Sequence, residues 1–153
     1  MSLNKLNQLY RAVVLDHASH PHHKNDLGDA TQSIELHNIS CGDDIRVFVK
    51  ITTNKVEKIS FTGDGCTISQ ASASMMTDAL TGVPITKALE ECDAFLKLTM
   101  GQTVPTTIQN DLGDAAILGS LAAFPARIKC ATLAWHAAKT ALGGEENEYN
   151  NFE

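Results

Sequence analysis

The sequence feature that most constrains the fold is an alternation of side chains along residues 45–52, followed by a short polar turn. Two sets of residues alternate there: Ile45, Val47, Val49 and Ile51 with Arg46, Phe48, Lys50 and Thr52. A period of two is typical of a strand that packs one face on a core. The turn at 53–55 favours a hairpin into a strand at 56–61, and 34–39 is expected to form the preceding strand. The sequence therefore predicts an antiparallel meander of three strands.

Segments with helical periodicity lie on both sides of this strand region. The sequence predicts helices over residues 3–19, 68–82, 84–100, 114–124 and 125–142. Pro21 ends the first pattern, and Asp114 and Pro125 are residue types that begin helices. The polar segment 101–112, which contains Pro105, is expected to be a loop.

Length and charge restrict the number of domains and the class of partner. With 153 residues, 43% of them hydrophobic, the chain is expected to form one domain over residues 1–142. Residues 143–153 include four Glu and three Asn and are expected to form a disordered acidic tail. A net charge of -6 without a cluster of Lys and Arg argues against nucleic acid as a partner.

The N-terminal residues run into an amphipathic stretch, so we expect no secretory signal, no membrane span and a cytoplasmic protein. Cytoplasmic thiols are kept reduced, which argues against a disulfide framework. The four cysteines are then core residues, metal ligands or reactive thiols. Cys92 shares the apolar face of the helix predicted over 84–100 and is expected to be buried.

The other three cysteines each stand where a strand or loop meets a turn or a helix start. Their contexts are Ser40-Cys41-Gly42-Asp43, Gly65-Cys66-Thr67 and Lys129-Cys130-Ala131. Gly42 permits a tight turn, so Cys41 and Asp43 are expected to face one point. A tetrahedral zinc site needs four ligands, which three Cys and one Asp supply. The spacing matches no simple zinc-binding pattern, so from chemistry alone a metal site and separate core cysteines both stay open.

Cys130 falls in the first two turns of the helix predicted to begin at Pro125, between the cations Arg127 and Lys129. A helix N-terminus and nearby positive charge both favour a thiolate there. Arg127 has two interpretations. It pairs with Asp43 or with a sulfur anion, or it is a solvent-exposed cation at the helix start.

Three further groups have simpler explanations than a functional site. The histidines lie around the predicted helix end at Pro21, and surface or capping roles are expected for them rather than a second metal site: His17, His20, His22 and His23. Asp111 and Asp114 are expected to cap a helix start. The pair Met75-Met76 is expected to fill the core.

Three stretches together carry a resemblance to a known family. They are Ser40-Cys41-Gly42-Asp43, Gly63-Asp64-Gly65-Cys66-Thr67-Ile68-Ser69, and Phe124-Pro125-Ala126-Arg127-Ile128-Lys129-Cys130-Ala131-Thr132-Leu133-Ala134-Trp135. Leu15-Asp16-His17 followed by Pro21 is similar to the family's opening motif. By these motifs the chain resembles the IscU/NifU N-terminal family of iron-sulfur cluster assembly proteins, specifically its SufU branch, as far as about Leu142.

The resemblance implies an IscU-like α+β fold: a three-stranded antiparallel sheet packed with about five to six helices, and a metal site at one end. It implies zinc held by Cys41, Asp43, Cys66 and Cys130. It further implies that Cys41 accepts sulfur from the persulfide of a SufS-type cysteine desulfurase, and that downstream SUF cluster-assembly proteins are partners. The chain would then act as a sulfurtransferase-like carrier.

Two departures separate the chain from the scaffold-type members of that family. Lys129 stands where those members have a histidine, and Phe124 to Lys129 replace their chaperone signal after an added segment near 103–123. Two rival functions stay open. One is a scaffold on which Cys41, Asp43, Cys66 and Cys130 hold a transient [2Fe-2S] cluster, and the other is a structural zinc domain without sulfur chemistry. A hydrolytic zinc enzyme is disfavoured because three thiolates make the metal a poor Lewis acid.

Overall fold

The computed structural model describes residues 3–144, with side chains from residue 8 onward. The elements in chain order are α1 (Leu3–Ser19), β1 (Gln32–Asn38), β2 (Asp43–Thr52), β3 (Lys55–Asp64), α2 (Thr67–Leu80), α3 (Ile85–Thr99), α4 (Thr106–Leu112), the 3-10 helix η1 (Gly113–Ala123) and α5 (Pro125–Ala141). This is an α+β fold, and the predicted sheet and number of helices are confirmed within the described range.

The sheet is the predicted meander, with strands in the order β1-β2-β3 and both pairs antiparallel. Val47 at its centre pairs with Ile34 on one side and with Phe61 on the other. The side chains of Ile45, Val47 and Phe61 are fully buried. The alternation along 45–52 therefore does fix which face of the sheet meets the core.

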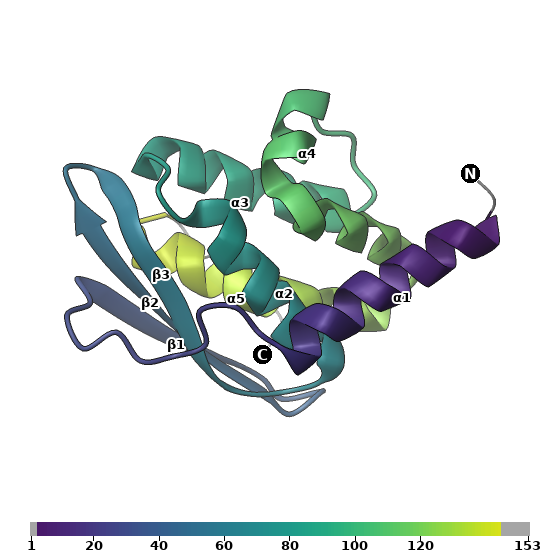
Figure 1. Cartoon of the computed structure of the whole chain (residues 1–153), viewed down its shortest axis with the longest axis horizontal. Coiled ribbons are helices and arrows are strands. Elements are labelled where there is room, and N and C mark those ends of the chain that lie inside the picture. The colour runs from purple at the N-terminus through teal and green to yellow at the C-terminus, as the bar shows by residue number, and fades with distance from the viewer. Residues whose placement is uncertain (1–2, 145–153) are drawn as a thin grey trace.

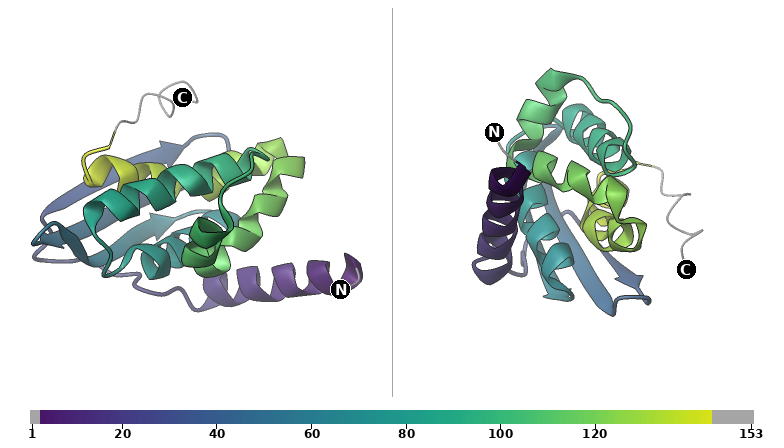
Figure 2. Two further views of the ribbon diagram at one scale, coloured as in Figure 1. Left: turned by 90° about the horizontal axis from the view of Figure 1, so that it is seen from above. Right: turned by 90° about the vertical axis from the view of Figure 1, so that its right-hand side faces the viewer.

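The helices lie on one face of this sheet (Figures 1 and 2). Helix α5 packs against β1 and β2, α2 packs beside it and against β3, and α3 covers α5 from the other side. Helix α1 packs along the outer side of α2. Between the helices, the rings of Phe95 and Trp135 stack with centroids 4.1 Å apart, and Trp135 Nε1 donates to Ser72 Oγ at 3.0 Å.

The segment expected to be a loop contains a helix, so that prediction is wrong over part of its length. Helix α4 begins directly after Pro105, whose carbonyl oxygen accepts from the amides of Ile108 and Gln109. Proline needs no amide partner at a helix start, so it begins a helix as readily as it interrupts one. The side chain of Leu112, the last residue of this short helix, is buried.

The segment predicted as a helix over 114–124 is helical, but it forms the 3-10 helix η1. Its buried side chains are Ala115, Leu118 and Leu121, each three positions after the last. A 3-10 helix has three residues per turn and aligns these side chains on one face, whereas an α-helix would spread them.

The predicted surface or capping role of His17 and the predicted capping roles of Asp111 and Asp114 are wrong, because tertiary contacts decide what these side chains do. His17 is only 2% exposed, and its ring contacts Ser74 Oγ through Nδ1 at 2.7 Å and Asp114 Oδ2 through Nε2 at 2.9 Å. Asp114 thus partners a buried histidine, and no side chain caps η1. Asp111 pairs with Lys87 at 2.6 Å near the end of α4 instead of capping a helix start.

At the other end of α5, Gly143 and Gly144 close the helix, since their amides donate to the carbonyls of Thr140 and Lys139. The remainder of the predicted tail, residues 145–153, lies outside the described residues.

Cys92 is fully buried on α3, as expected. No helix within residues 3–144 is long and apolar enough to cross a membrane.

Candidate metal centre

The fold brings the three other cysteine segments together at one end of the sheet. Cys41 lies in the turn between β1 and β2, where Gly42 has a positive φ of 71°, and Asp43 is the first residue of β2. Cys66 caps the N-terminus of α2, and Cys130 lies in the second turn of α5. A conformation that glycine adopts easily thus lets thiol and carboxylate on either side of it turn to the same point.

Three of the four sequence-predicted ligands have their ligand atoms within 4.8 Å of one another: Cys41, Asp43 and Cys130. The sulfur atoms of Cys130 and Cys41 are 2.8 Å apart. Cys66 joins this group by two hydrogen bonds: its amide donates to Asp43 Oδ1 at 2.8 Å, and its thiol bonds with that of Cys130. Asp43 and Cys130 are buried, Cys66 is half-buried and Cys41 is exposed.

Asp43 is the most completely bonded member of the group. Its Oδ1 accepts from the Cys66 amide and from Ser69 Oγ at 3.1 Å, and its Oδ2 accepts from Asn38 Nδ2 at 3.3 Å. Asn38 also donates to Cys130 Sγ at 3.6 Å. Sequence reasoning missed Asn38 and Ser69, although Ser69 ends one of the motifs that carry the family resemblance.

Gly65 is required at this site for space. A Cβ atom there would lie 2.5 Å from Asp43 Oδ1 and 2.3 Å from Ser69 Oγ. Both distances are far shorter than van der Waals contact, so only glycine lets the start of α2 approach the carboxylate this closely. The close approach also brings the Cys66 amide to Asp43.

The thiols of this group shift one another's pKa values. The hydrogen bond with the Cys130 thiol lowers the pKa of Cys66 to about 6, with a smaller contribution from the Ser69 amide at the helix N-terminus. The same hydrogen bond, together with burial, raises the pKa of Cys130 far above its ordinary range. The hydrogen bonds with neighbouring thiols thus act on the pKa of Cys130 in the opposite direction to the helix start and the flanking cations.

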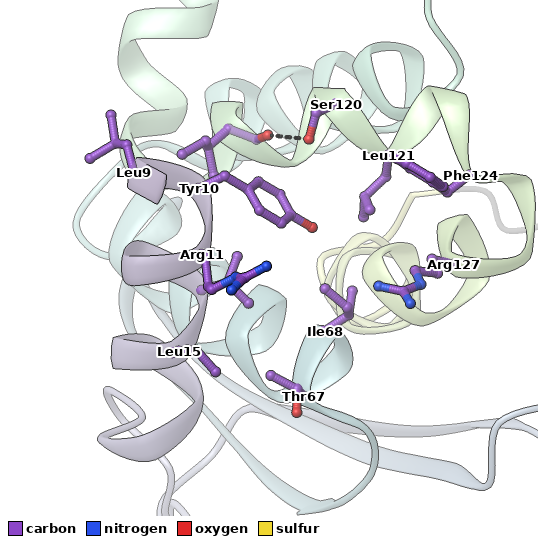
Figure 3. A pocket seen from close by; sticks show the side chains of 12 residues that line it. Leu9, Tyr10, Arg11, Leu15, Thr67, Ile68, Ser120, Leu121, Phe124 and Arg127 are labelled. Carbon is purple, nitrogen blue, oxygen red and sulfur yellow. Dashed lines mark hydrogen bonds between the residues drawn. The ribbon is translucent and has the colours of Figure 1, made fainter. Parts of the chain in front are cut away.

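Arg127 does not pair with Asp43 within the described part of the chain. It is exposed in the first turn of α5 and faces a groove of about 730 Å³ between α1, α2, η1 and α5 (Figure 3). Its charge partly offsets the burial that raises the pKa of Tyr10 across the groove. The apolar lining includes Leu15 and Phe124, both largely exposed. Of its two interpretations, the solvent-exposed cation fits this position.

The donor set fits a borderline-soft cation. Three thiols and one carboxylate would match the four ligands of a tetrahedral zinc site, and the same thiols suit iron-sulfur ligation. Asn38 and Ser69 hold the carboxylate in place, as outer partners of metal ligands do. A free acid-base residue for hydrolysis is not part of this group among the described residues.

The fold and the site define a small α+β domain with a three-thiol, one-carboxylate donor set at one end of its sheet. The chain belongs to the family of the NifU-like N terminal domain, which it matches over residues 9–144.

Two curated relatives align with nearly the whole chain. It is 48% identical to the iron-sulfur cluster assembly scaffold protein IscU of Streptococcus pyogenes serotype M1, over 96% of this chain and 91% of that protein. It is 43% identical to the zinc-dependent sulfurtransferase SufU of Bacillus subtilis, over 95% of this chain and 98% of that protein. Membership of the IscU/NifU family, predicted from the motifs, is thereby confirmed.

Solved structures agree with the fold. A hypothetical protein superposes with a TM-score of 0.82 at 48% identity, covering 89% of this chain and 98% of that one. A putative scaffold protein for the SUF system from Fervidobacterium islandicum AW-1 superposes with a TM-score of 0.81 at 26% identity, with the same coverage. The IscU-like architecture is therefore confirmed.

Proposed function

We propose that this chain accepts sulfur at Cys41 from the persulfide of a SufS-type cysteine desulfurase and carries it into iron-sulfur cluster assembly in the cytoplasm. The observation that carries the proposal is the exposure of Cys41. Of the four thiols, all within the described residues, Cys41 alone is exposed, Cys66 is half-buried, and Cys92 and Cys130 are buried. The Bacillus subtilis relative, named a zinc-dependent sulfurtransferase, supports the same assignment.

Cys41, Asp43, Cys66 and Cys130 are the residues that would hold zinc in this proposal. Zinc, when bound, keeps thiols deprotonated near neutral pH and protects them from oxidation. Asn38 and Ser69 fix the carboxylate of Asp43 from two sides. The carboxylate is thus held by hydrogen bonds that do not involve Cys41, so these bonds would stay in place when the exposed thiol reacts.

The transfer is a thiol-disulfide type of exchange. The Cys41 thiolate attacks the outer sulfur of the desulfurase persulfide and forms a new S–S bond to it. The bond between the two persulfide sulfurs breaks, and its electron pair leaves with the cysteine thiolate of the desulfurase. No external oxidant is consumed, because the transferred sulfur keeps its oxidation state.

The groove beside the site is the surface we assign to the desulfurase. Thr67 follows Cys66 directly and Arg127 lies one turn before Cys130, so the groove begins next to the thiols. Its lining carries two cations, Arg11 and Arg127, and no carboxylate. In a chain of net charge -6 this local positive charge favours an acidic, partly apolar segment of the partner. In this proposal Arg127 supports sulfur transfer by binding that segment of the desulfurase.

The test is a desulfurase assay with Cys41→Ser, in which zinc content is measured on the same samples. We expect loss of the desulfurase stimulation and of the persulfide detected on this chain by mass spectrometry. Cys92→Ala is the matched control, since it removes a buried thiol on α3 that is outside the site. Full stimulation by a Cys41→Ser protein that retains its zinc would refute the acceptor role.

A scaffold role is the second candidate, because the Streptococcus pyogenes relative is named a scaffold protein. The same donor set would then hold a transient [2Fe-2S] cluster, which is the product of assembly and is passed to the recipient protein. Anaerobic reconstitution followed by cluster transfer to an apo-ferredoxin would favour this role. Zinc that stays bound through purification and blocks reconstitution would count against it.

A further inference from the structure

A second group of metal-ligand side chains lies away from the thiols, where the end of α1 meets α2. His17 is in the last turn of α1, His22 is in the connection that follows, and Asp78 is near the end of α2. Their ligand atoms all lie within 4.8 Å of one another. Two imidazoles and one carboxylate thus converge from three segments of the chain.

The contacts within this group leave it accessible from outside. His22 Nδ1 lies 2.6 Å from Asp78 Oδ2, and the two side chains are 45% and 42% exposed. The ring of His17 stands behind them, with its centroid 4.6 Å from that of His22. A metal ion could enter from solvent and replace the proton between His22 and Asp78. The buried ring of His17 would then be its third ligand, on the side away from solvent.

The backbone that carries His22 is held firmly in place. The His22 amide donates to Ser74 Oγ at 2.8 Å. His23 has a positive φ of 56°, which is uncommon for a residue with a side chain. Its carbonyl accepts from the Phe61 amide at 3.0 Å, and its ring Nδ1 lies 2.9 Å from Thr77 Oγ1. The connection is therefore anchored to both α2 and β3, so the backbone position of His22 does not depend on the contact of its ring with Asp78.

We propose that His17, His22 and Asp78 form a second metal site, which binds a divalent first-row transition ion such as Zn²⁺, Co²⁺ or Fe²⁺. Imidazole nitrogen and carboxylate oxygen suit these ions, and two histidines with one carboxylate leave further positions for water. His17 takes part by giving up one of its two hydrogen bonds, to Ser74 or to Asp114. The other bond then orients the ring, as outer partners of ligating histidines do.

The second site is too far from the thiols to share their ion. Cys66 caps one end of α2 and Asp78 lies near the other, twelve residues along the chain. At 1.5 Å per residue, the two positions are about 18 Å apart along the helix. The two sites also differ in ligand chemistry, since the second contains no sulfur.

The contact between His22 and Asp78 has a close counterpart that serves as a control. His20 Nδ1 and Asp16 Oδ1 lie 3.7 Å apart on the exposed side of α1, with side chains 81% and 70% exposed. This pair is not part of any group of three potential ligands among the described residues. A metal effect that came from surface imidazoles alone would appear equally at His20 and at His22.

The experiment is equilibrium dialysis of the full-length protein, loaded with only one zinc per chain, against Co²⁺, followed by absorption spectroscopy. We expect one Co²⁺ per chain in addition to the zinc, with weak d–d bands and no sulfur-to-cobalt charge-transfer band. His22→Ala and Asp78→Asn should each weaken Co²⁺ binding by about tenfold or more, since loss of even an outer partner costs about 10- to 100-fold. His20→Ala should bind as the wild type does.

Either of two results would overturn the proposal: Co²⁺ binding that is unchanged in His22→Ala and Asp78→Asn, or binding lost equally in His20→Ala. A charge-transfer band from the added Co²⁺ would place it at the thiols and would also contradict the second site. Both variants change half-exposed side chains, so their folding is expected to persist and is checked by circular dichroism. The sulfur-transfer proposal is unaffected by these outcomes, because its test changes Cys41 alone.

Discussion

Glu91 gives the sharpest prediction for stability, because its carboxylate is buried without a partner. The residue lies on α3, is 1% exposed, and neither Oε1 nor Oε2 has a hydrogen-bond partner within the described structure. Burial raises its pKa from 4.5 to about 7, against the opposing charge of Lys87 and with smaller contributions from Asp111 and Glu90. The folded protein therefore prefers the neutral acid at this position.

The direction of the pH effect follows from proton binding in the two states. In the unfolded chain Glu91 loses its proton near pH 4.5, whereas the folded protein keeps it until about pH 7. Between these values the folded state binds more protons, so the free energy of unfolding falls as the pH rises. A tenfold change in proton affinity is worth about 1.4 kcal/mol, so the full loss is about 3 kcal/mol.

The assay is urea unfolding of wild type and Glu91→Gln at about pH 5 and about pH 8, the two sides of this window. Wild type should lose about 2–3 kcal/mol more than the variant over that interval. Glu90→Gln is the matched control, because Glu90 is an exposed neighbour on the same helix and should leave the wild-type pH dependence in place. Equal pH dependence of wild type and Glu91→Gln would refute the reasoning.

Two further substitutions test the metal centre and the core. Gly65→Ala places a Cβ against Asp43 and should lower the zinc content measured by elemental analysis. The control Gly28→Ala, whose Cβ would have nothing within 4 Å, should leave the zinc content unchanged. Equal zinc content in the two variants would contradict the role of Gly65. Phe95→Ala removes the ring stacked on Trp135 and should lower the free energy of unfolding by about 3–5 kcal/mol in urea denaturation. A loss below about 1 kcal/mol would show that the core refills the space.

Sequence patterns predicted the parts of the fold that depend on local periodicity. The alternation from Ile45 to Thr52 and the turn after it fixed the sheet, because a period of two leaves one choice of buried face. The start of α5 was also predicted from a local signal, the residue type at Pro125. Convergence of the three cysteine segments was not local, and it was predicted only through the resemblance of whole motifs to a family.

Apart from the short helix after Pro105, the errors concern side chains whose role is set by contacts with other segments of the chain. His17 looked like a helix-end histidine, yet its partners Ser74 and Asp114 lie 57 and 97 residues further along the chain. Asn38 was overlooked because an asparagine near a strand end has no periodicity to mark it. The thiolate character of Cys130 was judged from its own helix, whereas hydrogen bonds with the thiols of neighbouring segments raise its pKa.

Helix α2 connects the two sites, and its sequence explains how. It is buried along most of its length and rich in Ala and Ser, which lets α1 and α5 approach closely on opposite sides. Ser72 accepts from Trp135 and donates to the carbonyl of Ala131, the residue after Cys130, while Ser74 contacts His17 and His22. A change in the middle of α2 should therefore disturb both sites, whereas changes at His22 or Cys41 should each affect one. Small polar residues inside this helix thus position both sets of ligands.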